Sequence, residues 1–345
     1  MNSSTWQNPG QLFVAQVFKN LIYNSVAELR MSMKKRKNKS LYKKRTRRRR
    51  RNRSRNRKQM SIMKNLSDYF TLDTTIHPGK GVMFYTFDNA KRMEFIQDCL
   101  LPFREAYIES KKLQDIVNIY GVSVQEAVEG RLPDKGKVMS GDFGEILCLY
   151  LAVQLWSADV TVIPMKWRLK DKKKDASHYT DVIMFKLTDK DNPSVDDKMY
   201  TYEVKTRASK LGNTHYKVHK QKARIGYKDG KPECTFIEAV VDANTDAVQR
   251  AAETIPYLKI RCQDEGLKEL HDKINRFSTG GKGVIFQREH NAVAVIDSSD
   301  LNLQVSRIPP DLFTAHASVN NVYCVPIADL QTLYESIYQQ MPNIK

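Results

Sequence analysis

Residues 201–205 read Thr-Tyr-Glu-Val-Lys, and residues 180–183, earlier in the chain, read Thr-Asp-Val-Ile. Both stretches are rich in β-branched and aromatic residues, so each is expected to form a β-strand. Side chains on a strand alternate between its two faces, so Glu203 and Lys205 project to the same side. The chain therefore places a carboxylate and an ammonium group side by side in an apolar strand, with Asp181 arriving from the strand before.

The segments around these two strands alternate between helical and strand patterns. Residues 146–156 carry no charge, which predicts that a helix over 141–157 is buried on most sides. The polar run 188–197 predicts a loop that joins the two strands as an antiparallel pair. Strands are expected at 160–164, 179–187, 199–206, 235–242, 283–287 and 292–296, and helices at 243–255 and 327–340. This order predicts an α/β fold with a mixed central sheet flanked by helices.

Upstream of this core, residues 64–134 have a mixed and mostly helical pattern. Apolar residues recur near helical spacing across 90–114, and Pro102 is expected to break or kink that helix. We therefore predict three parts: a basic leader over 1–63, a helical lead-in over 64–134 and an α/β domain over 135–345.

The positive charge of the chain is concentrated in the leader. The sequence holds 57 Lys and Arg against 39 Asp and Glu, but residues 34–58 contain 17 of the basic residues and no acid. Subtracting 17 from 57 leaves 40 basic against 39 acidic residues, so the net charge of +18 is no sign that the body binds nucleic acid. Like charges repel, so the leader is expected to be disordered. The leader is either a nucleic-acid tether or localisation signal, or a non-native extension. We favour the non-native extension, because nothing downstream requires this segment.

Composition also excludes several classes of protein. The five cysteines are isolated and odd in number, which argues against a zinc cluster or a secreted disulfide framework and predicts a reducing cytoplasm. The longest apolar runs are too short to span a bilayer, and the N-terminus lacks a signal-peptide pattern. No P-loop, dinucleotide fingerprint or G-x-S-x-G motif occurs. We expect a cytoplasmic protein with no membrane partner and no small-molecule cofactor.

The two acids of the strand pair are candidate metal ligands. Taken singly, Asp181 is typical of a turn and Glu203 of a solvated strand face. Across an antiparallel pair they become neighbours, and two carboxylates with the Val204 carbonyl are the hard oxygen ligands that suit Mg²⁺ or Mn²⁺. Such a metal activates water and neutralises phosphate charge, and Lys205 supplies a further positive charge.

A third acid, Glu145, lies near the start of the charge-free helix and has two interpretations. Asp142 as N-cap with Glu145 three residues later is a helix-start signature, and this is the favoured interpretation on the motif alone. In the other interpretation Glu145 faces the sheet and assists a metal site. Gly141 and Gly144 would then allow the helix backbone to approach the sheet closely.

Asp181, the Glu203-Val204-Lys205 triplet and Glu145 on a preceding helix together resemble the PD-(D/E)XK phosphodiesterase superfamily, although Thr180 stands where proline or glycine is usual. The resemblance implies a restriction-endonuclease-like core in which Asp181 and Glu203 bind the metal. It also implies that Lys205 is the catalytic lysine and that Glu145 is an accessory acid.

Within that superfamily, residues 141–147 (Gly-Asp-Phe-Gly-Glu-Ile-Leu) resemble the HamA family, the nuclease subunits of Hachiman anti-phage defence systems. The resemblance spans about 140–207, with weaker support from 235–239. It implies an Mg²⁺-dependent deoxyribonuclease, an endonuclease effector that a partner helicase restrains until invading DNA releases it.

Further residues are weaker candidates for contact with the DNA backbone. They are Arg207, Lys217 and Lys220 in the basic stretch after the second strand, and Gln249 and Arg250 on the helix after a core strand. Trp167 could stack on a base, but a partly buried side chain is favoured, and His178, His215 and His219 are interpreted as parts of solvated segments. The alternative function is a non-catalytic nucleic-acid-binding protein that works through its basic leader.

Overall fold

The computed structural model describes residues 65–76, 81–156, 158–170, 180–189, 191–208, 227–228, 231–232, 236–244, 246–278, 286–301 and 319–344. The leader over 1–63 lies outside these ranges, as do His178, His215, Lys217, His219 and Lys220. What the sequence predicts for them stays a prediction. Within the described ranges, the helices are too short or too polar for any of them to cross a membrane.

Six strands form one mixed sheet in the order β1-β2-β8-β7-β4-β3. The four inner strands run parallel to one another, and the edge strands β1 and β3 are each antiparallel to their neighbour. The strands are β1 (Phe70–Asp73), β2 (Val82–Phe87), β3 (Val182–Lys186), β4 (Lys198–Arg207), β7 (Gln287–Asp297) and β8 (Asn321–Ile327). A separate two-stranded ribbon pairs β5 (Tyr227–Lys228) with β6 (Lys231–Pro232).

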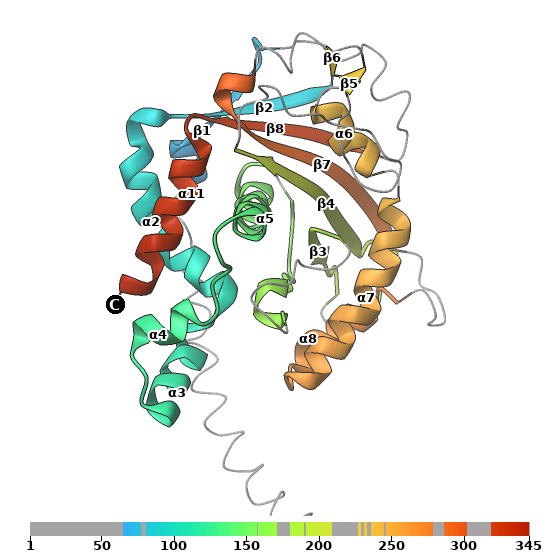
Figure 1. Ribbon diagram of the computed structural model, residues 1–345. Helices are drawn as coiled ribbons and strands as arrows, with labels where there is room; N and C mark the ends of the chain where they lie inside the picture. Colours follow the sequence, from blue (N-terminus) through green and yellow to red (C-terminus); the bar gives the residue numbers. More distant parts are fainter. Residues whose placement is uncertain are drawn as a thin grey trace, which may run out of the picture. The chain divides into compact units, whose positions relative to one another are not determined.

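Helices cover both faces of the sheet (Figure 1). One face carries α2 (Arg92–Tyr107), α5 (Lys137–Gln154) and α11 (Leu330–Gln340), and the other carries α6 (Phe236–Ala243), α7 (Ala247–Asp264) and α8 (Lys268–Asn275). Helices α3 (Ser110–Tyr120) and α4 (Val124–Glu129) follow α2, and short 3-10 turns η1 (Leu66–Asp68), η2 (Asn89–Lys91), η3 (Lys166–Leu169), η4 (Ser298–Asp300) and η5 (Met341–Asn343) complete the elements. The α/β fold with a mixed sheet flanked by helices is confirmed.

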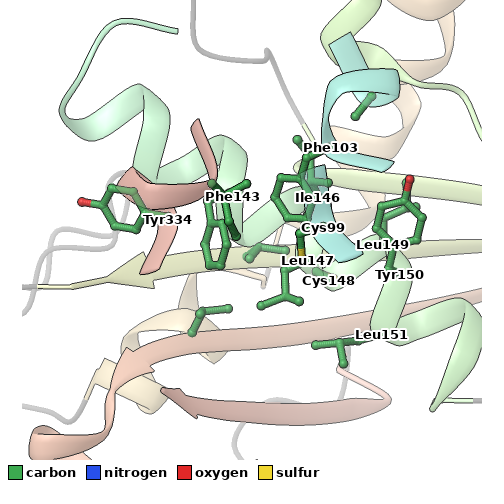
Figure 2. Packing of buried hydrophobic residues seen from close by; sticks show 14 of the residues in the cluster. Cys99, Phe103, Phe143, Ile146, Leu147, Cys148, Leu149, Tyr150, Leu151 and Tyr334 are labelled. Carbon is green, nitrogen blue, oxygen red and sulfur yellow. The ribbon is translucent and has the colours of Figure 1, made fainter. Parts of the chain in front are cut away.

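Helix α5 is the centre of the larger hydrophobic core. Its residues 142–152 are all buried, as the charge-free sequence predicts. Figure 2 shows the apolar side chains of α5 packed with Cys99 and Phe103 of α2 and with Tyr334 of α11. Gly144 lets α5 lie directly on β4, because a Cβ atom at this position would be 1.8 Å from Thr206 Oγ1. Gly141, by contrast, has open space around it.

Several elements differ from the sequence prediction. Of the strand expected at 235–242, residues 236–242 form most of helix α6 instead, because the apolar Phe236, Ile237, Val240 and Val241 recur at helical spacing and pack on the sheet. Residues 160–164 contribute only an isolated bridge between Val162 and Phe185. Helix α5 begins at Lys137, four residues before the expected start, so Asp142 lies inside the helix and caps nothing.

The remaining differences concern strands that the sequence reading missed. Residues 64–134 contribute β1 and β2 to the sheet as well as helices, and Pro102 is accommodated inside α2. The expected strand at 292–296 is the second half of the longer β7. Residues 321–327 form β8, so the last helix starts at Leu330 rather than at Ile327.

Candidate functional site

The candidate site lies where the edge of β4 is left open by a shorter neighbour. Strand β3 pairs with residues 198–202 of β4, and the register ends at the pair Val182 and Tyr202. Residues 203–207 of β4 therefore extend beyond β3. Asp181 stands just before β3, and its Oδ2 accepts a hydrogen bond of 2.8 Å from the Val204 N–H. Since the N–H and C=O of one strand residue point to the same side, the Val204 carbonyl also faces this open edge.

Two cations meet the acids of this edge. The Nζ of Lys205 lies 3.1 Å from Asp181 Oδ2 and also donates to Glu203 Oε1. The second oxygen of Glu203 is 2.6 Å from the Arg250 guanidinium, which reaches in from α7. Glu203 is only 3% exposed. The predicted residues Asp181, Glu203 and Lys205 thus converge within contact distance.

The charges of this cluster depend on one another. Burial alone would raise the pKa of Asp181, but Lys205, Lys166 and the Val204 N–H hold it below its ordinary value. Burial and, after it, repulsion from Asp181 are the largest causes that raise the pKa of Glu203. Attraction to Lys205 and Arg250 opposes this rise. Burial would lower the pKa of Lys205, yet Asp181 and Glu203 raise it above its ordinary value. Lys205 is accordingly a fixed positive charge between two carboxylates.

The donor set at this edge fits a hard divalent cation. Asp181 and Glu203 already share one cation, the Lys205 ammonium, so their oxygens converge on a common position. With the Val204 carbonyl, the donors are all oxygen, as Mg²⁺ and Mn²⁺ prefer. Within the described ranges, no group of three or more His, Cys, Asp or Glu side chains is arranged to hold a metal. The two carboxylates would therefore need backbone, water or phosphate oxygens to complete a coordination shell.

Glu145 approaches the same edge from the opposite face of the sheet. Val204 and Thr206 face Gly144 of α5, so Glu203 and Lys205 face the α7 side, and Glu145 lies on the α5 side. Its Oε2 is 3.1 Å from Lys166 Nζ and accepts a 3.1 Å hydrogen bond from the Trp167 indole N–H.

The environment of Glu145 strongly affects its ionisation. Burial raises the pKa of Glu145 to about 7, with Lys166 opposing the rise and Asp181 adding to it. Glu145 therefore belongs electrostatically to the Asp181 cluster, although it pairs with Lys166 and accepts a hydrogen bond from Trp167.

Asp142, one turn before Glu145, has a second buried lysine as its partner. Lys170 Nζ lies 2.7 Å from both carboxylate oxygens of Asp142, and the Tyr107 hydroxyl donates to Oδ2 at 2.8 Å. Tyr107 also shares a 2.8 Å hydrogen bond with Tyr338. Asp142 therefore links elements of the fold rather than capping a helix. Its network connects α5 to Lys170 at the end of η3, to α2 and to α11.

The weaker candidates are placed differently from one another. Arg207 is buried at the end of β4, and Gln249 is exposed on α7, where it donates to Glu253. Arg250, expected to contact phosphate, is paired with Glu203. Trp167 is 4% exposed, so it is buried more completely than the sequence predicts, and its indole N–H donates to Glu145.

Sequence reasoning missed Lys166 and Lys170. A signal was present, because two acids three residues apart on an otherwise charge-free buried helix require cations nearby. The pair Lys166 and Lys170, four residues apart, supplies them.

Comparison with curated proteins found no match. The family model described as HamA matches residues 60–341, a range that contains every site residue discussed above. Since this match covers most of the sequence, the chain belongs to the HamA family.

Proposed function

We propose that this chain is a metal-dependent nuclease that hydrolyses DNA phosphodiester bonds and serves as the effector of a Hachiman defence system, controlled by a partner helicase. Membership of the HamA family suggests a role related to Hachiman defence and is compatible with nuclease activity. The observation that carries the proposal is the convergence of Asp181, Glu203 and Lys205 at the open edge of β4.

In this proposal Asp181, Glu203 and the Val204 carbonyl hold Mg²⁺ or Mn²⁺. The bound ion would supply a Lewis acid for the phosphate and lower the pKa of a water molecule. Asp181 is fixed for this task by the Val204 N–H, and Glu203 by Arg250. Preorganised ligands of this kind need little rearrangement when the ion binds.

Lys205 contributes a positive charge that needs no proton transfer. Its Nζ lies between the two carboxylates, where it can orient an attacking water or stabilise the charge that develops on the phosphate. Arg250 holds Glu203 through Nη1 and the Ala243 carbonyl through Nη2, and its remaining N–H groups can donate to a phosphate oxygen, so its expected contact with DNA is retained as part of the proposal.

The test is cleavage of single- and double-stranded DNA by the full chain in Mg²⁺, compared with EDTA. We expect Lys205→Ala, Glu203→Gln and Asp181→Asn each to lower the cleavage rate by at least about 100-fold. Lys198→Ala is the matched control, because Lys198 lies on the same strand and pairs with Glu289, away from Asp181. It should cleave at the wild-type rate. Full activity in the Lys205 and Glu203 variants would refute the site.

The same assay tests the alternative function. If deletion of residues 1–59 abolishes DNA binding and every effect on DNA, while substitutions at Glu203 and Lys205 change nothing, the chain is a binding protein that works through its leader.

A further inference from the structure

The two peptide groups on either side of the Thr180 Cα, just before Asp181, are held by side chains rather than by the sheet. The Thr180 carbonyl accepts a 3.0 Å hydrogen bond from Lys166 Nζ, and the Thr180 N–H donates to Thr254 Oγ1 at 3.1 Å. Lys166 belongs to η3 and Thr254 to α7, so two different elements form hydrogen bonds to the backbone of Thr180. The register of β3 begins only at Val182, so these two bonds satisfy backbone groups that strand pairing leaves over.

Lys166 is almost completely buried. The Lys166 side chain is 5% exposed and its ammonium is 3.1 Å from Glu145 Oε2. A buried ion pair is weak support for stability, because the desolvation of both ions offsets much of their attraction. Apolar residues in the same space would serve the core as well. The presence of the buried Lys166–Glu145 pair is therefore better explained by the hydrogen bond from Lys166 to the Thr180 carbonyl than by a contribution to folding.

The contact has a direct geometric consequence for Asp181. The Thr180 carbonyl belongs to the peptide plane from which Asp181 departs, and the Thr180 N–H belongs to the plane before it, so the two bonds fix both planes that lead into Asp181. Asp181 must bring one oxygen to both the Val204 N–H and Lys205 Nζ, so a small rotation of these planes would break both contacts. Residues that lock the rotamers of functional side chains typically lie in this second layer.

We propose that Lys166 is a positioning residue for the nuclease site, and that Glu145 acts through it as its counter-ion. Lys166 holds the Thr180 peptide, the peptide orients Asp181, and Glu145 keeps the Lys166 ammonium in place. This role differs from that of an accessory metal ligand, which the resemblance implies for Glu145. The inference rests on the proposed function, because it concerns the same metal-binding edge.

The experiment measures Mn²⁺ binding to the full chain without DNA, by calorimetry, together with the Mg²⁺ concentration that gives half-maximal cleavage. Lys166→Met should weaken Mn²⁺ binding and raise the Mg²⁺ midpoint at least about tenfold, a typical cost of losing an outer-shell partner. Lys166→Arg, which retains the cation, should recover part of this loss.

Lys170→Met is the matched control. Lys170 directly follows η3, and its side chain is also buried and paired with an acid of α5, but it binds Asp142 rather than Thr180. We expect a similar loss of stability in urea and a change in Mn²⁺ affinity of less than about twofold. Equal shifts in the Lys166 and Lys170 variants would reduce Lys166 to a structural residue and overturn the proposal.

A double variant tests the role given to Glu145. If Glu145 acts only through Lys166, then Glu145→Gln combined with Lys166→Met should bind Mn²⁺ no more weakly than Lys166→Met alone. Additive losses would mean that Glu145 contacts the ion independently, which contradicts the proposal.

Thr254→Val tests whether the backbone of Thr180 positions Asp181, even if Lys166→Met does not fold. Thr254→Val removes the other partner of Thr180 with little change in shape, and it should weaken Mn²⁺ binding in the same direction. Unchanged binding in Thr254→Val would overturn the idea that the Thr180 peptide controls Asp181. The proposed function is judged separately: if Lys205→Ala cleaves DNA like wild type, the function fails, whereas an inactive Lys205→Ala with normal Mn²⁺ binding in Lys166→Met refutes only the present inference.

Discussion

Replacing Gly144 with alanine would force a new atom into the contact between α5 and β4. The Cβ atom would lie 1.8 Å from Thr206 Oγ1, 3.2 Å from Thr206 Cβ and 3.4 Å from Val204 Cγ1. Non-bonded heavy atoms are comfortable at about 3.5–4.0 Å, so the helix and the strand must separate or Thr206 must rotate. Overpacking of this kind costs roughly 1–3 kcal/mol, and a clash this short belongs at the upper end. Alanine regains about 1 kcal/mol of helix propensity, which leaves a net loss of about 2 kcal/mol.

The assay is urea unfolding of the full chain, with Gly141→Ala as the matched control. Gly141 lies in the same helix but has open space around its Cβ position, so alanine there should stabilise by up to about 1 kcal/mol. The double variant Gly144→Ala, Thr206→Ala removes the 1.8 Å contact. It should recover most of the loss, which corresponds to a coupling energy of roughly 1–3 kcal/mol.

Cleavage provides a second measurement on the same variants. Thr206 follows Lys205 on β4, so a displaced strand end should misplace the proposed catalytic lysine, and a shift of about 1 Å can lower a rate about 100-fold. The reasoning is refuted if Gly144→Ala is as stable as Gly141→Ala, or if the two substitutions at 144 and 206 show no coupling.

Three further predictions concern single residues. The pKa of Glu145 is raised from 4.5 to about 7 in the folded state, so its contribution to stability is present below about pH 4.5 and is lost as pH rises through 7, by at most about 3 kcal/mol. Between pH 5 and pH 8 the free energy of unfolding should therefore fall more for wild type than for Glu145→Gln. Equal falls in the two proteins would contradict the assignment. Ser123→Ala removes the capping box that Ser123 and Glu126 form at the start of α4 and should cost about 1 kcal/mol in urea unfolding, whereas Glu126→Gln, which preserves the box, should cost less than half of that. Gly121 ends α3 at φ +66° with nothing within 4 Å of its Cβ position, so Gly121→Ala should cost about 1 kcal/mol from backbone conformation alone, and Gly121→Asn, which tolerates this conformation, should cost less.

The sequence predicted best those parts of the fold whose pattern is local. The charge-free run 146–156 indicated a buried helix, and the polar run 188–197 indicated an antiparallel pair, and both are present. Two of the strands it missed, β2 and β8, pair with each other although most of the chain separates them. Such a pairing depends on tertiary contacts that no local window contains. Residues 235–242 were misassigned because a β-branched apolar run is typical of both a strand and a buried helix.

For the candidate site, residue types were predictable and partners were not. The alternation of β4 placed Glu203 and Lys205 on one face, and the structure brings both to Asp181. The lysines of η3 were missed because their role depends on where a turn remote from the strands lies in space. Asp142 was interpreted as a cap because the helix start was placed four residues late, and because an Asp with a Glu three residues later is typical of a helix start.

The length of β3 determines which part of the β4 edge is left open. Had β3 continued in the same register through residues 180 and 181, its backbone would occupy the edge of β4 that the Asp181 carboxylate now occupies. The strand stops at Val182, so Asp181 bonds to the Val204 N–H with its side chain and remains beside the Val204 carbonyl. Glu203 and Glu145 flank this edge from opposite faces, each held by a basic residue. The candidate site therefore lies at the edge of the sheet, with α5 packed on one face and α7 on the other.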